Sequence, residues 1–225
     1  MKKVMILAFA AGSFMISCKD SNSDQSTTQT EQEVAAETGV TYALDEASSS
    51  LKWKAYHKGG LDPRFGTVKS TGTISAENGA VTSGSFTIDM NSLTTDPTAV
   101  DTAKSGGKTS VDLDGHLKNA DFFEVDKYPT AKFEITGVTA FDATKDKSNI
   151  ADANQMVSGN LTLKDKTVNV TFPAKVTVSE TEVSLVSNFT INRQDWGLTY
   201  GAEGDVKDWG ISQEVYIELN VKAKK

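Results

Sequence analysis

The strongest constraint on the fold is an alternation of apolar and polar residues that recurs from about Tyr42 to the end of the chain. It is clearest over residues 215–222, where Val, Ile, Leu and Val occupy every second position and Tyr, Glu, Asn and Lys lie between them. Successive side chains of a β-strand point to opposite faces, so this period of two predicts strands with one buried face. Similar patterns occur at residues 51–58, 65–75, 85–90, 130–136, 157–178 and 183–191. We therefore predict an all-β protein.

Turn signals separate the predicted strands. Asn78-Gly79 is a strong signal for a two-residue hairpin, and a second tight turn is expected near Asp165. Consecutive hairpins build antiparallel sheet, which can eliminate its exposed edges by closing on itself. The fold we predict is an antiparallel β-barrel of about eight strands, and a two-sheet sandwich is the alternative.

A short helical segment is predicted just before the strand at residues 130–136. Leu113, Leu117 and Ala120 are spaced at three to four residues, as on one face of a helix, and two phenylalanines follow. Pro129 then favours an extended backbone at the residue before it, so the chain can enter the strand. We expect a helical plug over the end of the barrel. An ordinary loop with core anchors is the alternative, because neighbouring aromatic residues are usually buried.

The N-terminus has the pattern of a bacterial lipoprotein signal. Two lysines precede an apolar run, Val4–Ile16, which is shorter than the roughly 20 residues of a membrane-spanning helix but suits a signal peptide. Met15–Cys18 resembles a lipobox, and its cysteine is the only one in the chain. We predict a signal peptide over residues 1–17 and lipidation of Cys18, with a plain secretory signal as the alternative. The protein would then be anchored in the cell envelope, facing the periplasm or the cell surface.

The next segment, residues 18–40, is predicted to be a disordered tether. It consists mainly of Ser, Thr, Gln, Asp and Glu, with almost no large apolar residue. Such a sequence has little surface to bury and cannot offset the entropy that ordering would cost. It would act as a spacer between the membrane and a barrel domain at residues 41–225.

Charge and motifs weigh against nucleic-acid binding and catalysis. The formal charge of -7 disfavours contact with a phosphate backbone. His57 and His116 are the only histidines, they lack the HExxH spacing of a zinc site, and the GxSxG, P-loop and dinucleotide patterns do not occur. Arg193 and Asp195 could serve a ligand head group or pair with each other. We predict no catalytic or metal site.

An ordered series of short motifs resembles the YceI family. The motifs are Trp53-Lys-Ala-Tyr-His57 with Phe65-Gly66, His116-Leu-Lys-Asn-Ala-Asp-Phe-Phe123, Tyr128-Pro-Thr-Ala-Lys-Phe133, Gly159-Asn-Leu-Thr-Leu163 with Val170-Thr-Phe-Pro173, and Ile191-Asn-Arg-Gln-Asp-Trp-Gly-Leu198. The resemblance covers about residues 41–224. It implies a lipocalin-like antiparallel barrel that holds a long isoprenoid chain in its bore.

The predicted barrel could accommodate such a ligand. An eight-stranded barrel has a bore just wide enough for side chains or for one slender molecule. The strands, the plug and the family motifs supply the candidate ligand contacts, which are Trp53, His57, Phe65, Phe86, Leu117, Phe122, Phe123, Phe133, Phe189, Arg193 and Trp196. For the apolar members of this set, plain core packing is the alternative, and the sequence of a filled barrel would look the same.

We therefore expect an envelope lipoprotein that carries or stores an apolar isoprenoid-type lipid of the quinone or prenyl-phosphate class, with no other cofactor. Two alternatives remain. The protein could be an envelope enzyme acting on such a lipid through His57, His116 or Arg193, or a surface lipoprotein with a filled barrel and no ligand. The oligomeric state is open, and a dimer is possible.

Overall fold

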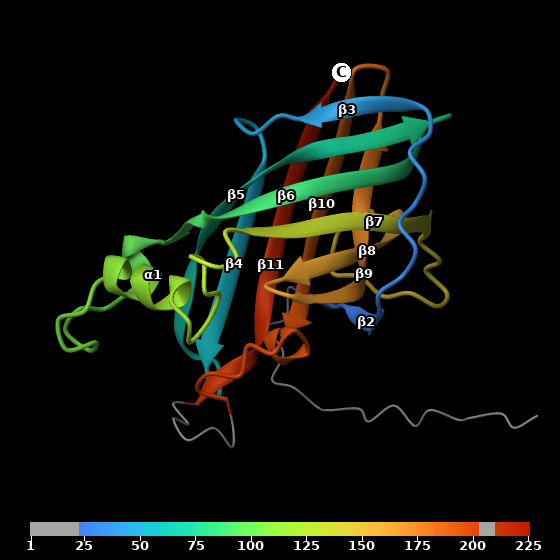
Figure 1. Cartoon of the computed structure of the whole chain (residues 1–225). Coiled ribbons are helices and arrows are strands. Elements are labelled where there is room, and N and C mark those ends of the chain that lie inside the picture. Colours follow the sequence, from blue (N-terminus) through green and yellow to red (C-terminus); the bar gives the residue numbers. More distant parts are fainter. Residues whose placement is uncertain (1–22, 203–209) are drawn as a thin grey trace, which may run out of the picture.

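The computed structural model describes residues 23–202 and 210–225, and nearly all of its regular structure is β-strand (Figure 1). Two short strands, β1 (Asp24–Gln25) and β2 (Thr27–Thr30), precede the main ones. The main strands are β3 (Val40–Leu44), β4 (Ser50–His57), β5 (Leu61–Glu77), β6 (Ala80–Thr95), β7 (Thr130–Ala140), β8 (Gln155–Leu163), β9 (Lys166–Val178), β10 (Glu182–Asn192) and β11 (Ile211–Lys224). The helical elements of the described part are η1 (Pro97–Ala99), α1 (Ser110–Lys118) and η2 (Arg193–Trp196).

The main strands close into an eight-stranded antiparallel barrel. Sequential neighbours pair from β5 through β9. β3 and β4 share one position, because both pair with β5 on one side and with β11 on the other. β10 completes the circle by pairing with β11 and with β9. The predicted barrel is confirmed, and the sandwich alternative is wrong.

The two predicted tight turns are present, and they differ in which residue types adopt a positive φ. Between β5 and β6, Asn78 and Gly79 have φ values of 52° and 80°, which suit the type I′ turn that matches strand twist. Between β8 and β9, Lys164 takes φ 56°. This left-handed conformation is uncommon for a lysine, because its Cβ crowds the backbone there.

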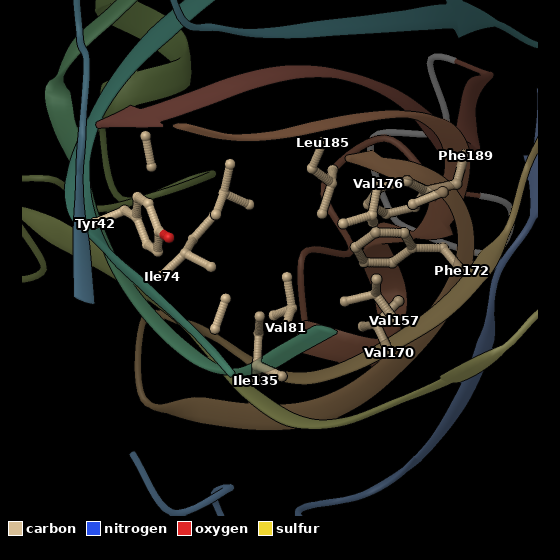
Figure 2. Close-up of a cluster of buried hydrophobic side chains, with 14 of the residues drawn as sticks. Tyr42, Ile74, Val81, Ile135, Val157, Val170, Phe172, Val176, Leu185 and Phe189 are labelled. Atoms are coloured by element: carbon tan, nitrogen blue, oxygen red, sulfur yellow. The ribbon is translucent and has the colours of Figure 1, made fainter. Parts of the chain in front are cut away.

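Apolar side chains on the inner faces of the strands form two adjoining clusters. The larger one includes Ile74, Val157 and Phe172, and the smaller one includes Ile88 and Met90. Figure 2 shows members of the larger cluster pointing inward from the wall, with Tyr42 and Ile74 on one side and Phe172 and Phe189 on the other. The apolar residues of the sequence alternation therefore face the interior of the barrel.

The prediction of a disordered tether is wrong for its described part, residues 23–40. We call residues 23–38 the N-terminal strap. Within it, β1 pairs with β10 and β2 pairs with β9. Figure 1 shows the segment after β2 running along the outside of the barrel toward β3. Pairing with the strand backbones satisfies the N–H and C=O groups of the strap. This pairing orders the segment even though its polar sequence buries almost no apolar side chain. Residues 18–22 lie outside the described residues.

The predicted helix is present as α1. Before it, the Thr109 N–H and hydroxyl both donate to the Asp112 carboxylate at 2.8 Å, and these hydrogen bonds hold the pKa of Asp112 below its ordinary value. A second carboxylate, Asp114, accepts the Thr95 N–H at 2.7 Å. Because Thr95 is the last residue of β6, this bond fixes α1 beside the end of that strand (Figure 1).

Within the described residues, no helix combines the length and the apolar character that crossing a membrane requires.

Candidate ligand cavity inside the barrel

The barrel encloses a cavity of about 850 Å³. This volume lies in the range of roughly 300 to 1,000 Å³ that is usual for small-molecule sites. All eight strand positions contribute to the lining, which is dominated by Val, Leu, Ile and Phe, and α1 contributes at the open end. The interior is therefore only partly filled by side chains and presents a mainly apolar surface.

Inward-facing glycines help to keep the bore open. A Cβ atom at Gly159 would lie 2.3 Å from Cζ of Phe133 on the neighbouring strand, so the ring occupies the space where a side chain would stand. At Gly84, a Cβ would lie 2.9 Å from the Ile135 side chain. The missing side chains let neighbouring apolar groups lie close to the wall instead of projecting across the bore.

Four phenylalanines form a row along one side of the cavity. The rings of Phe172 on β9 and Phe189 on β10 stack with centroids 4.0 Å apart and an interplanar angle of 3°. Phe133 lies 6.0 Å from Phe172 and 6.4 Å from Phe86. All four line the cavity. The row offers a continuous aromatic surface to a long apolar molecule.

At the open end, α1 is joined to the segment after η2 by an aromatic cluster. The His116 ring meets Phe122 at 5.2 Å and Tyr200 at 4.9 Å, edge to face in both cases, and Phe122 lies 5.0 Å from Tyr200. His116 Nε2 is also 3.3 Å from the Asp121 carboxylate. This cluster holds the predicted plug against the barrel, and its members line the mouth of the cavity.

Most of the candidate contacts predicted from the sequence line the cavity. On the strands these are Trp53, His57, Phe86, Phe133 and Phe189. Leu117, Phe122 and Phe123 line it near α1, and Arg193 lines it at the start of η2. The structure thus brings together residues from six different elements and the segment after α1.

Two of the predicted contacts, Phe65 and Trp196, do not line the cavity. Phe65 pairs with Lys54 on β4 and shares the outer face with it, because Gly66 and Val68 take the inward phase. Trp196 is only 2% exposed, and its Nε1 donates to the Leu161 carbonyl at 2.8 Å. Its role is to pack η2 against the barrel.

Sequence reasoning missed Phe172 and Tyr200. Phe172 lies at an apolar position of the strand pattern predicted at 157–178, but it could not be distinguished from an ordinary core residue. Tyr200 follows η2 in a stretch without periodicity. Glycines within predicted strands, at the inward phase, were the available signal that the bore is open. Gly159 satisfies that description within the strand predicted at 157–178, and Gly84 immediately precedes the strand predicted at 85–90.

The polar atoms that face the cavity differ in how well they are paired. Among the described residues, Trp53 Nε1 and His57 Nδ1 are buried without a hydrogen-bond partner. The Arg193 guanidinium instead donates to the carbonyls of Leu198, Ile211 and Ser212, and Arg64 Nη1 donates to three carbonyls, including that of Ala99 at 3.1 Å. The two arginines are therefore engaged with main-chain carbonyls, and the two cavity-lining residues of the described chain that hold a buried polar atom without a partner, Trp53 and His57, both lie on β4.

The described residues contain no cluster of three or more His, Cys, Asp or Glu side chains with a geometry suited to a metal ion.

Comparison with known proteins gives a consistent result. A UPF0312 protein of Pseudomonas aeruginosa (strain LESB58) is 33% identical in an alignment of 154 residues that covers 62% of this chain and 68% of the relative. Burkholderia cenocepacia BcnA superposes with a TM-score of 0.57 at 19% identity, covering 80% of this chain and 99% of BcnA. A domain from Saccharophagus degradans described as polyisoprenoid-binding gives 0.54 at 19% identity, covering 85% and 99%. The two structures share the fold.

The YceI-like domain model matches residues 42–223, which are nearly the whole barrel. The chain therefore belongs to the YceI-like domain family.

Proposed function

We propose that this protein is a lipid-binding lipoprotein of the cell envelope that holds an apolar isoprenoid-type lipid in its barrel for carriage or storage. The observation that carries the proposal is the enclosed cavity of about 850 Å³ with its largely apolar lining. A cavity of this kind binds by removing apolar surface from water, and it offers few groups for chemistry on a ligand. We accordingly propose binding rather than turnover.

A long, slender chain suits the shape of the site. Each five-carbon unit moved out of water contributes roughly 3 to 4 kcal/mol at about 0.8 kcal/mol per carbon, before the costs of association and ordering. The polyisoprenoid-binding description of the Saccharophagus degradans domain, which shares this fold, supports the same class of ligand.

The polar atoms support a neutral, oxygen-bearing head group over a phosphate. A phosphate would need several cationic donors. Among the described lining residues, both arginines are engaged with backbone carbonyls, which leaves Lys108 as the one lysine at the site. The unpaired indole N–H of Trp53 requires only an acceptor, and the imidazole of His57 can donate or accept, depending on its tautomer. A carbonyl oxygen of the quinone class would satisfy Trp53, so we propose that class.

Anchoring at Cys18 is the second half of the proposal. Cys18 lies outside the described residues, and the support for its acylation is the lipobox-like sequence Met15–Cys18 together with the absence of any other cysteine.

Neighbouring residues on β10 provide a matched test. Leu185 is buried and lines the cavity, whereas Val186 is 42% exposed on the outside of the same strand. Leu185→Trp should occupy ligand space and lower the amount of isoprenoid lipid recovered from the purified protein at least severalfold. Val186→Trp should retain as much lipid as the wild type. Equal recovery from both folded variants would contradict binding inside the barrel.

A further inference from the structure

The barrel wall has an incomplete seam between β9 and β10. These strands pair directly only through Val183–Val186 and Lys175–Val178, whereas β10 and β11 pair along the full length of β10, Glu182–Asn192. Direct pairing ends near Pro173, which has no N–H to donate. The Pro173 carbonyl accepts a hydrogen bond from the Ser187 hydroxyl on β10 at 2.7 Å. Beyond this point the two strands separate.

The N-terminal strap fills the seam from the outside. β1 runs parallel to β10, with Asp24 opposite Phe189, and β2 runs antiparallel to β9, with Thr27 opposite Thr171. The Ser26 hydroxyl adds a 2.6 Å hydrogen bond to the Thr190 carbonyl. The strap therefore satisfies backbone groups that the separated strands would otherwise leave unpaired.

The strap is held at its start by the loop between β7 and β8 and at its middle by a side chain of β8. The Asp24 carboxylate accepts from the Ser148 hydroxyl at 2.6 Å and from the Asn149 N–H at 2.7 Å. Farther along, the Asn160 side chain accepts the Gln32 N–H at 3.0 Å and donates to the Gln32 carbonyl at 2.7 Å. Asn160 is only 2% exposed because the strap covers it.

The attachment is almost entirely polar. No strap residue belongs to either apolar cluster of the described chain, and Val34 is 44% exposed. A segment held by hydrogen bonds, without apolar burial, sits at the low-stability end of a structure and opens before the core does. Directly behind it, the stacked rings of Phe172 and Phe189 line the cavity.

We propose that the strap is a detachable latch over a lateral opening of the cavity, and that isoprenoid lipid enters and leaves between β9 and β10 when the strap is displaced. The proposal rests on the proposed function. The strap lies outside residues 42–223, the part of the chain that matches the family model. The open end beside α1 is the competing route.

A reversible cross-link tests the route. Thr27 and Thr171 are directly opposed across β2 and β9, at a spacing that suits a disulfide. In the full chain carrying Cys18→Ser, Thr27→Cys with Thr171→Cys would lock the strap when oxidised. The matched control is Thr162→Cys with Thr167→Cys, an outward-facing pair between β8 and β9 that leaves the strap free.

The readout is transfer of a dansyl-labelled geranylgeranyl lipid from phosphatidylcholine vesicles to the protein, followed by energy transfer from tryptophan. Oxidation of the strap pair should slow transfer about tenfold or more, reduction should restore it, and the control pair should show neither effect. The amount bound at equilibrium should be unchanged. Equally fast transfer with the strap locked would overturn the latch and assign the route to the open end.

A loosening variant and a ligand-free measurement complete the test. Asp24→Ala removes two hydrogen bonds of the strap and should speed transfer severalfold without changing the amount bound; an unchanged rate would count against the latch. Hydrogen exchange should show the amides of residues 27–30 opening earlier than those paired between β10 and β11, and equal protection would refute a detachable strap. If the wild type binds no lipid but its strap still opens early, the proposed function and the lipid route are both contradicted. The strap would then be detachable without serving as a lipid gate.

Discussion

Two tryptophans show how the environment of one polar atom separates a structural residue from a candidate ligand contact. Trp196 Nε1 donates to the Leu161 carbonyl at 2.8 Å, and its ring is buried with η2. Trp53 Nε1 is buried in the cavity wall without a partner. A buried N–H without an acceptor is unfavourable, so the Trp53 site is more stable when a ligand supplies one.

Substituting each tryptophan by phenylalanine should therefore give opposite results. Trp53→Phe should weaken binding of a carbonyl-bearing isoprenoid about 2- to 10-fold relative to a hydrocarbon of equal chain length, because one hydrogen bond is lost. Trp196→Phe should lower the free energy of unfolding by about 1 to 2 kcal/mol without changing that ratio.

Titration of both lipids into each variant measures the ratio of the two affinities, and denaturant unfolding measures the free energy of unfolding. An unchanged ratio in Trp53→Phe would mean that water already satisfies the indole. Failure of even the hydrocarbon to bind would contradict the cavity as a lipid site.

At the scale of elements, α1 and the residues after it line the mouth of the cavity. Phe122 is 7% exposed and packs against His116 and Tyr200, and Phe123 packs against the smaller apolar cluster. Both also line the cavity. Their side chains are therefore placed to contact a ligand as well as the core.

Truncating these side chains should destabilise the lipid-loaded protein more than the delipidated protein. Phe122→Ala and Phe123→Ala remove core packing worth about 3 to 5 kcal/mol at a fully packed site. A ligand that binds only the native state adds to stability, so losing contacts with it enlarges the penalty in the loaded form. Thermal unfolding with and without extracted lipid measures both penalties, and equal values would show that the two phenylalanines serve only the core.

The strands could be predicted because the alternation of apolar and polar residues indicates which face is buried. In Val215–Val221, the apolar positions are the ones that face the cavity. The strap could not be predicted in the same way. Residues 27–30 bury no apolar side chain, so their strand character comes from pairing with the backbone of β9, which leaves no periodicity in the sequence. The cavity could not be predicted either, because apolar alternation is identical for a filled and a hollow barrel. Phe65 was assigned to the wrong face, because the face on which it lies depends on its register with Lys54.

For the whole molecule, the ordered strap changes the expected distance between barrel and membrane. If Cys18 is acylated, the chain from Cys18 to Ser23 can span at most about 18 Å, because an extended residue advances no more than about 3.6 Å. A free tether reaching to residue 41 could span about 80 Å by the same measure. Docking of the strap would thus hold the barrel close to the lipid surface.

Anchoring itself is tested by Cys18→Ser. The variant should move from the membrane fraction to the soluble fraction while its thermal unfolding matches that of the wild type, because the barrel lies downstream of the anchor. Fractionation with a detergent-extracted control measures the partition. A variant that stays with the membrane would argue against acylation at Cys18.

The central claim is that the barrel holds an isoprenoid-type lipid, and native mass spectrometry of the purified wild-type protein tests it most directly. We predict a mass above that of the polypeptide, which falls to the polypeptide mass after organic extraction, with an isoprenoid chain recovered in the extract. A wild-type protein that carries no such excess mass, and whose thermal unfolding is unchanged by added isoprenoid lipid, would contradict the account.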